Sequence, residues 1–280
     1  MAAHGSALSN YLKKVLLFGG GALCLIAVFA AVWSRVGRQT HTFTFRLGPP
    51  GTEVAAADLR RAGQVLQGRL AALRREFRLG ACAVRALPQD RVEMTFTCDG
   101  DPTEPVAWLT LQGKAEFRLL HPQDDVLERA GPEGLGPDYE VKVYRERRYL
   151  HVRLNEMRVV EHRYAVEREP VLTVGEFAGV TMDAVGLKKN VVLTFRFKEA
   201  DARAFAATTA LHAGRWMALL IDGEMFFPPK RIESAVAGGS VQVSGFFRIP
   251  TQRRLARVLD CGSLPQPLVP VPDPGADAGG

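Results

Sequence analysis

The residue types that perform catalysis are scattered in this sequence rather than grouped. Its six histidines show no metal-ligand spacing on a helix, and no HExxH motif occurs. There is no Cys-x-x-Cys pair, no nucleophile elbow around Ser240 or Ser244, and no P-loop lysine after the Gly-Gly-Ser turn at 238–240. We predict that the protein is not an enzyme and uses no cofactor, metal ion or small-molecule substrate. A catalytic site assembled from distant residues is the alternative, and a pocket with convergent ionisable groups would support it.

Two of the four cysteines have the spacing for a disulfide. Cys82 and Cys98 lie in two expected strands, "ACAVRAL" and "RVEMTFTC", which a turn at 88–90 joins. Hairpin pairing about that turn places the two thiols opposite or diagonal to each other, so a disulfide is geometrically possible in an exported domain. The alternative is a pair of small, half-buried free thiols.

The charge excludes one class of partner and suggests another. The net charge of +6 comes mainly from arginine, and the sequence holds no RNP, zinc-finger or helix-turn-helix signature, so we expect no nucleic-acid binding. Apolar residues at steps of three and four over 59–77 predict an amphipathic helix. Its other faces carry Arg60, Arg61, Arg69, Arg74 and Arg75. These arginines form either a solvated face or a contact with anionic lipid headgroups.

An uncharged segment near the N-terminus predicts a membrane anchor. Val15 to Trp33 is nineteen residues long, and at ~1.5 Å per helical residue it spans the ~30 Å hydrocarbon core. We expect a cytoplasmic N-terminus at 1–14 and an uncleaved transmembrane signal anchor at 15–34, followed by an exported ectodomain. Lysines before the span and arginines after it leave its orientation open on charge alone.

The ectodomain has an α+β pattern. Strands and helices alternate as strand (41–47), helix (59–77), the two cysteine strands, helix (102–111) and strand (114–121). This order is typical of a ferredoxin-like antiparallel sheet with two helices on one face. Strands with alternating charged and apolar residues follow between 139 and 169. We expect the whole of 40–172 to form a base subdomain.

A second, smaller α+β unit is expected at 173–268. It contains a Phe-rich strand at 191–197, a helix ending at Gly214, and an apolar hairpin whose turn is Asp222-Gly223. A further strand follows the Gly-Gly turn, and a helix runs to Gly262. We expect 269–280 to be a disordered tail rich in proline and glycine.

Four segments of this second unit follow one another as "VVLTFRFKEADARAFAATT", "LLIDGEMFFPPKRI", "GGSVQVSGFF" and "LDCGSLPQPL". In this order and spacing they resemble the first periplasmic domain of SecD, the bacterial accessory subunit of the Sec protein-export machinery. The matching residues are Asp222, Gly223, Pro229, Gly238, Gly239, Gly245, Gly262, Leu264, Pro265 and Pro267. More loosely, "VLQGRLAALRREFRLGACAVRAL" and "GKAEFRLLH" resemble the base subdomain of that family. The resemblance extends over residues 12–268.

The resemblance implies a protein of the bacterial inner membrane with its ectodomain in the periplasm, working with translocon subunits and unfolded exported polypeptides. It implies a base subdomain at 40–172 and a head subdomain at 173–268. In the family a multi-span membrane bundle follows, and the printed sequence has no second apolar span, so we expect no proton pathway here. An envelope adaptor that reuses the fold without a role in export is the alternative.

We expect the polypeptide to contact the hairpin, because its exposed edges can accept an extended strand. The candidate residues are Asp222, Gly223, Met225, Phe226, Phe227 and Pro229. The alternative is that these residues fill the core, since the alternation of a strand buries at least one of Phe226 and Phe227.

Overall fold

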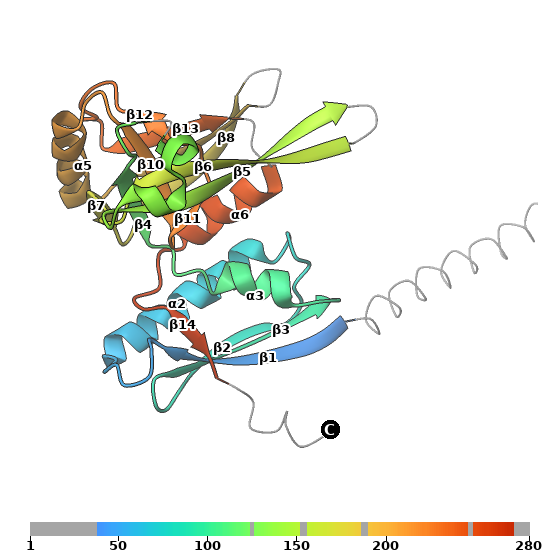
Figure 1. Cartoon of the computed structure of the whole chain (residues 1–280). Coiled ribbons are helices and arrows are strands. Elements are labelled where there is room, and N and C mark those ends of the chain that lie inside the picture. The colour runs from blue at the N-terminus through green and yellow to red at the C-terminus, as the bar shows by residue number, and fades with distance from the viewer. Residues whose placement is uncertain (1–37, 124–125, 152–155, 186–189, 246–248, 272–280) are drawn as a thin grey trace, which may run out of the picture.

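The computed structural model describes residues 38–123, 126–151, 156–185, 190–245 and 249–271. No helix within these ranges is long and apolar enough to cross a membrane. The expected transmembrane anchor at 15–34 and the end of the expected tail, 272–280, lie outside them. The described chain forms two lobes, which we call the first lobe (38–111 and 261–271) and the second lobe (114–260) (Figure 1).

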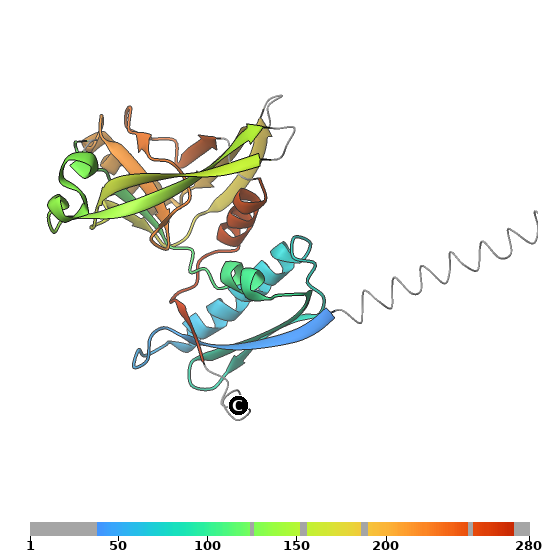
Figure 2. The same cartoon turned by 45° about the vertical axis from the view of Figure 1, so that its right-hand side comes forward.

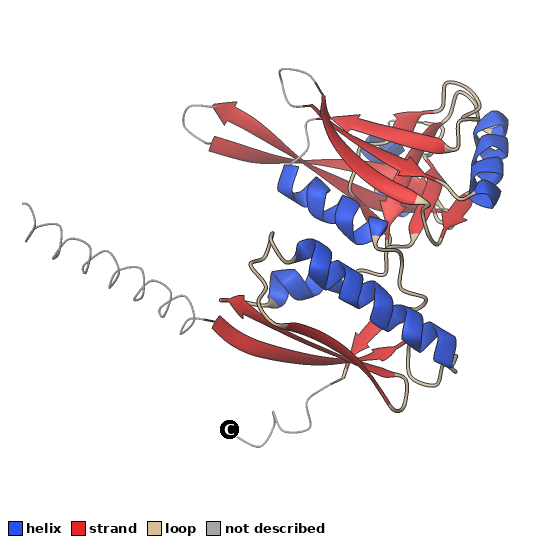
Figure 3. Ribbon diagram, turned by 180° about the vertical axis from the view of Figure 1, so that it is seen from behind, coloured by secondary structure: helices blue, strands red, loops and turns tan. Residues whose placement is uncertain are grey.

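The first lobe is an antiparallel sheet with helices on one face. Its sheet order is β14-β1-β3-β2, and the helices α2 and α3 lie between this sheet and the second lobe (Figures 1 and 3). Its elements are β1 (Arg38–Leu47), α2 (Ala56–Leu73), β2 (Cys82–Leu87), β3 (Arg91–Asp99), α3 (Thr103–Leu109) and β14 (Leu268–Pro270). This strand order and the all-antiparallel pairing are those of the predicted ferredoxin-like fold.

The core of the first lobe follows from two periodicities. In β3, every second side chain is buried, from Val92 through Met94 and Phe96 to Cys98, because a strand alternates its faces. In α2, Leu66, Leu70 and Leu73 recur at helical spacing, are at most 2 % exposed, and pack on that face of the sheet.

The strand that closes this sheet is not the one expected from the sequence. The segment 114–121, predicted as the fourth strand of the base, forms β4 (Ala115–Leu119) in the second lobe, between β10 and β7. The position beside β1 is taken instead by β14, which comes from the end of the expected head subdomain and the start of the expected tail. β4 has buried residues on both faces, which suits a central strand. The chain therefore crosses between the lobes twice, at 110–114 and 261–267, rather than once near 172.

The second lobe contains three antiparallel sheets around a phenylalanine-rich core. The orders are β11-β10-β4-β7 with β12 beside β10, then β13-β9-β8, then the hairpin β5-β6. The remaining elements are α4 (Val126–Ala130), the 3-10 helix η1 (Pro132–Leu135), β5 (Tyr139–His151), β6 (Glu156–Glu167), β7 (Leu172–Val174), β8 (Gly179–Val185), β9 (Asn190–Arg196), α5 (Glu199–Leu211), β10 (Trp216–Ile221), β11 (Glu224–Met225), β12 (Lys230–Arg231), β13 (Ser240–Gly245) and α6 (Ile249–Asp260). The β5–β6 hairpin extends beyond the rest of the lobe in Figure 1, and in Figure 2 it crosses in front of the other strands of the lobe.

Helix α6 belongs to both cores. Leu255 and Leu259 are buried in the core of the second lobe, whereas Val258 is buried in that of the first. On its face toward α2, Arg257 Nη1 lies 3.1 Å from Oε1 of Glu76, which follows α2. The guanidinium of Arg254 lies 4.3 Å from the centroid of the Phe77 ring. The two lobes are therefore joined by a shared helix as well as by two connections.

One arginine expected on a helix surface lies at this junction instead. Arg69 is 0 % exposed and donates to the carbonyl oxygens of Leu109 at 2.9 Å and Gly262 at 2.8 Å, and also to those of Leu111 and Gln112. It thus holds both connections. Burial lowers its pKa to about 10, partly opposed by the Coulombic effects of Cys261 and Asp222, so it is charged at neutral pH. Arg69 therefore lies neither on a solvated face nor at a lipid-contacting surface, and both predictions are wrong for this residue. The other four arginines of the set are exposed: Arg60, Arg61, Arg74 and Arg75.

Candidate polypeptide-binding site

The second lobe has an apolar cleft of about 360 Å³ between β10–β12, α5 and β13. Its floor is aromatic: Phe117 of β4, Phe205 of α5 and Phe227 are each at most 2 % exposed. The rings of Phe117 and Phe205 are 4.9 Å apart and tilted by 58°. Because these rings come from a strand, a helix and the loop after β11, all packed in one core, the floor is formed before any ligand arrives.

One wall of the cleft is a strand with an open edge. Val241 and Val243 of β13 line the cleft, and within the described residues β13 pairs only with β9. The amide of Phe197 donates to the carbonyl of Gly239 at 2.9 Å, which fixes the odd-numbered residues of β13 as those that bond β9. The N–H and C=O groups of Ser240 and Gln242 therefore point to the open edge. This edge offers main-chain hydrogen bonds beside an apolar surface.

The opposite rim carries charge. Lys230, Arg231 and Glu233 line the mouth of the cleft and are exposed. Deeper in, the Thr209 hydroxyl donates to Phe205 O at 2.8 Å and accepts from Val236 N at 2.9 Å. The polar atoms of Thr209 are therefore satisfied, and it presents no unpaired group to a ligand.

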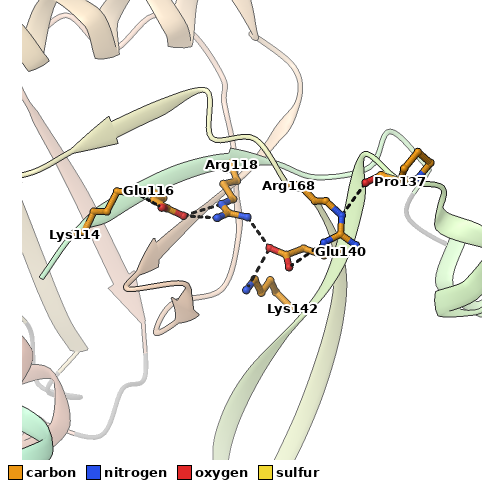
Figure 4. A network of polar contacts seen from close by, with 7 residues as sticks. All are labelled: Lys114, Glu116, Arg118, Pro137, Glu140, Lys142 and Arg168. Carbon is orange, nitrogen blue, oxygen red and sulfur yellow. Dashed lines mark hydrogen bonds and ion pairs between the residues drawn. The ribbon is translucent and has the colours of Figure 1, made fainter. Parts of the chain in front are cut away.

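A network of ion pairs fixes the β5–β6 hairpin to the strand under the cleft (Figure 4). The face of β4 opposite Phe117 carries Glu116 and Arg118. Arg118 Nη1 lies 2.6 Å from Glu140 Oε1, and Lys142 Nζ lies 3.3 Å from the same oxygen. Burial opposes ionisation of Glu116, but hydrogen bonds from Lys114 and Arg118 outweigh it and hold the Glu116 pKa below its usual value. The network therefore fixes β4 on the side away from the cleft.

The predicted turn residues brace the junction between the lobes. Asp222 and Gly223 have φ of +51° and +77°, which are the left-handed values of the expected hairpin turn. The Asp222 carboxylate accepts hydrogen bonds from Gly113 N at 3.0 Å and Lys114 N at 2.8 Å. Although Asp222 is exposed, its carboxylate holds the first connection in place.

Most of the predicted apolar contact residues lie in the core. Met225 is 7 % exposed and packs with Leu220 in a small cluster under the β5–β6 hairpin. Phe227 is 1 % exposed, and Pro229 is also buried. Phe226 is half-buried against Trp108, with ring centroids 6.3 Å apart. Of the six candidates only Phe227 lines the cleft, and it does so as floor. The prediction missed Val241 and Val243, although their alternation with polar Gln242 in "SVQVS" was a usable signal.

The two strand cysteines are free thiols in the structure. Cys82 is paired with Phe96, and Cys98 with Gln39, so the two cysteines are diagonal neighbours as the hairpin predicts. Cys82 is exposed and Cys98 is buried. Burial is the main cause that raises the pKa of both thiols. The structure holds both cysteines as free thiols, and the possible disulfide stays a prediction.

Comparisons with known proteins agree on one family. The family described as "SecDF, P1 head subdomain" matches residues 150–266. Protein translocase subunit SecD of Acidaminococcus fermentans is 38% identical over 77 residues, which are 28% of this chain and 18% of that protein. The SecD subunit of Rickettsia bellii is 28% identical over 120 residues, 42% of this chain and 23% of that protein. The chain spans about a fifth of the length of these curated relatives.

The solved structures with a similar fold are structures of SecDF. A crystal structure of SecDF in Super-membrane-facing form has a TM-score of 0.58 at 18% identity, and the match covers 84% of this chain and 30% of that chain. A structure of a membrane component SecDF that enhances protein export has a TM-score of 0.55 at 18% identity. That match covers 83% of this chain and 99% of the other. At this identity the likeness shows the fold alone, and it extends over both lobes.

Proposed function

We infer that this chain, which carries a periplasmic domain of the SecD family, is a membrane-anchored, non-enzymatic accessory of protein export that binds extended stretches of exported polypeptide in the cleft beside β13. The segment 15–34 anchors the chain in the bacterial inner membrane, and the domain lies in the periplasm. Its further partner is the Sec translocon. The likeness to named translocase subunits supports this assignment.

The observation that carries the proposal is the pairing of an apolar cleft with an open strand edge. An unfolded chain exposes apolar side chains and unpaired main-chain groups, and the cleft floor and the β13 edge suit these two features. Strand addition obtains its affinity from main-chain hydrogen bonds, so it accepts many sequences. A protein that handles many exported chains needs this tolerance.

The character of the cleft supports a binding role. Among the described residues no group of three or more His, Cys, Asp or Glu side chains is arranged to hold a metal ion. The charged residues at the mouth of the cleft, Lys230, Arg231 and Glu233, are exposed and surround an apolar floor. This composition suits binding rather than proton transfer.

A proline scan of the strand edges tests the proposal. Gln242→Pro removes an N–H that points to the open edge, and it removes no bond to β9 because Gln242 N does not face β9. Ala86→Pro is the matched control, since Ala86 holds the same outward position on the edge strand β2 of the first lobe. A lost hydrogen bond of ~0.5–1.5 kcal/mol plus steric blocking predicts about tenfold weaker peptide binding for Gln242→Pro alone.

The measurement is fluorescence anisotropy of a labelled unfolded segment of a secretory protein, titrated with the purified full-length chain. Circular dichroism of each variant establishes that it is folded. Equal affinities of the two proline variants and the unchanged chain would reject the β13 edge as the site. Failure of the unchanged chain to bind any such peptide would reject polypeptide binding and favour the envelope adaptor.

A further inference from the structure

The first lobe is joined to the proposed membrane anchor by a very short tether. β1 begins at Arg38, and the anchor segment ends at residue 34. A chain extends at most ~3.6 Å per residue, so the steps from 34 to 38 span no more than about 14 Å in any conformation. In a chain held by that anchor, the start of β1 therefore stays close to the membrane surface.

The turn that follows α2 lies beside the start of β1. Helix α2 runs back along the sheet, so its last turn and the start of β1 are at the same end of the first lobe (Figures 1 and 2). The turn leads to Gly80, whose N–H donates to the carbonyl of Thr97 at 2.7 Å, and Thr97 is the cross-strand partner of Thr40. Arg38 Nη1 lies 3.7 Å from the point where a Cβ on Gly80 would stand. The turn at 74–80 therefore shares the end of the lobe that the tether holds near the membrane.

This turn carries three exposed arginines, Arg74, Arg75 and Arg78. Arg74 Nε donates to the carbonyl of Leu79 at 3.3 Å, within the turn. In the part of the chain that the structure describes, no carboxylate forms an ion pair with any of the three. Arg78 has φ of +51°, a backbone region that favours glycine, so the turn itself does not call for an arginine. The three charges are therefore available to a partner outside the chain.

The acidic residues at this end of the lobe do not neutralise the turn. Four carboxylates lie here, and each has a partner other than the three arginines. The pairs are Glu76 with Arg257 at 3.1 Å, Asp99 with Arg38 at 3.3 Å, Asp101 with the hydroxyl and N–H of Thr103, and Glu104 with Arg254. The surface of the turn is therefore positively charged where it meets solvent.

We propose that Arg74, Arg75 and Arg78 are a docking site for anionic lipid headgroups of the membrane in which the chain is anchored, an inference that rests on the anchor of the proposed function. Guanidinium groups bind phosphate oxygens through paired hydrogen bonds, which an exposed arginine can form without breaking a bond inside the protein. The phosphates of the bilayer surface are the anions that the tether brings within reach. The attraction of a basic residue to an anionic surface falls off within a Debye length, ~8 Å at physiological salt, so the short tether is what makes this contact effective.

The other exposed arginines of α2 lie outside this site. At ~1.5 Å per residue, Arg60 is about 20 Å from the end of the helix, more than two Debye lengths from the turn. Arg61 has a partner in the second lobe, since its Nη2 lies 2.6 Å from Glu176 Oε2. The helix therefore has a lipid-binding end rather than a lipid-binding side. Docking at the turn gives the first lobe a second contact beside its tether, which fixes its orientation on the membrane.

Photocrosslinking to lipid in reconstituted vesicles tests the site. The full-length chain carries a photoreactive residue at Ala81, beside the turn, or at Ala57, at the opposite end of α2; both positions are exposed. The vesicles are phosphatidylcholine alone, or phosphatidylcholine and phosphatidylglycerol at about 2:1, which supplies the anionic surface. With phosphatidylglycerol we expect roughly tenfold more lipid adducts from position 81 than from position 57. The yield at position 81 should fall severalfold in phosphatidylcholine alone, and also at ~1 M salt, where the Debye length is ~3 Å.

Single charge removals provide the matched control. Arg75→Gln and Arg78→Gln each remove one charge from the turn, whereas Arg60→Gln removes one from the far end of the same helix. We expect the adducts at position 81 to fall about fivefold in either turn variant and to be unchanged in Arg60→Gln. Equal yields with and without phosphatidylglycerol, or equal falls in the turn and control variants, would overturn the docking site. Alkaline carbonate extraction separates this failure from that of the anchor: release of the chain from the vesicles would overturn both, whereas retention of the chain with such equal yields would overturn the docking site alone.

Discussion

Arg69 offers the most direct test of how the two lobes are held together. Arg69 is 0 % exposed, and its guanidinium contacts both connections between the lobes. It donates to the carbonyl oxygens of Leu109, Leu111, Gln112 and Gly262. We expect Arg69→Met to lower the free energy of unfolding sharply. Methionine fills most of the space of the arginine stem but leaves these carbonyl oxygens without a donor.

The magnitude follows from two opposing contributions. Hydrogen bonds that involve a charged group contribute ~1.5–3 kcal/mol each, so four of them sum to about 6–12 kcal/mol. Burial of the charge opposes this, which is why the pKa of Arg69 falls to about 10. Removing one partner of a buried charged network costs ~3–5 kcal/mol net, and we expect about 4 kcal/mol here. Arg69→Lys, with three donors on a flexible stem, should lose about half of that because it cannot reach all four oxygens.

The assay is urea unfolding of the purified chain followed by tryptophan fluorescence, which includes Trp108 at the junction of the two cores. Arg60→Met is the matched control, because Arg60 lies on the same helix and is exposed. The control should change the free energy of unfolding by less than ~0.5 kcal/mol. Equal losses in the two variants would refute the reasoning that Arg69 holds the connections.

Further predictions concern the core, the turn, the acid dependence and the thiols. Phe227→Ala should lower the free energy of unfolding by ~3–5 kcal/mol, and Phe226→Ala, which truncates a half-buried ring, by clearly less; equal losses in urea unfolding would contradict the burial pattern. Asp222→Ala should cost ~1–3 kcal/mol in the same assay because Gly113 N and Lys114 N lose their acceptor, and Asp222→Asn, which keeps one oxygen, should cost less. The folded-state pKa of Glu176 is lowered by hydrogen bonds from Lys198 and Arg61 and by their charges, and that of Glu116 is lowered as described above. Both carboxylates therefore contribute stability above their usual pKa of 4.5 and lose it as pH falls below that value. Melting temperatures from pH 7 to pH 3 should therefore fall less steeply for Glu176→Gln, and a parallel fall would count against this account. Without reductant, Cys82 should react with a thiol reagent in the folded chain and Cys98 only after unfolding, whereas loss of both reactivities would indicate a disulfide.

The local elements were predictable because short-range periodicity determines them. The alternation in β3 and the apolar stripe of α2 both identified buried faces, and Asp222-Gly223 identified a turn that needs positive φ. The alternation does not show which other strand a given strand will pair with. β4 therefore looked like the closing strand of the first sheet, although its real neighbours, β10 and β7, lie far along the chain. β14 was missed because Pro270 within it, and Pro267 just before it, argue against a strand unless the strand is known to pair at the edge of a sheet.

The candidate site was only partly predictable. The hairpin was located correctly, but the faces of Met225 and Phe227 depend on the second sheet that packs on them, which the sequence does not place. Arg69 was misassigned because its partners are main-chain carbonyl groups. Every residue has such a group, so the sequence does not reveal which ones accept a hydrogen bond. The open edge of β13 is a property of the sheet order and appears only when the strands are assembled.

Site-specific photocrosslinking in living cells tests the central proposal most directly. A photoreactive residue at Gln242, on the open edge of β13, is compared with one at Ala86, on the open edge of β2. The proposal predicts crosslinks from position 242 to exported polypeptides, which disappear when export is blocked, and few or none from position 86. Crosslinks of equal yield at both positions, or crosslinks at 242 only to folded envelope proteins, would contradict it.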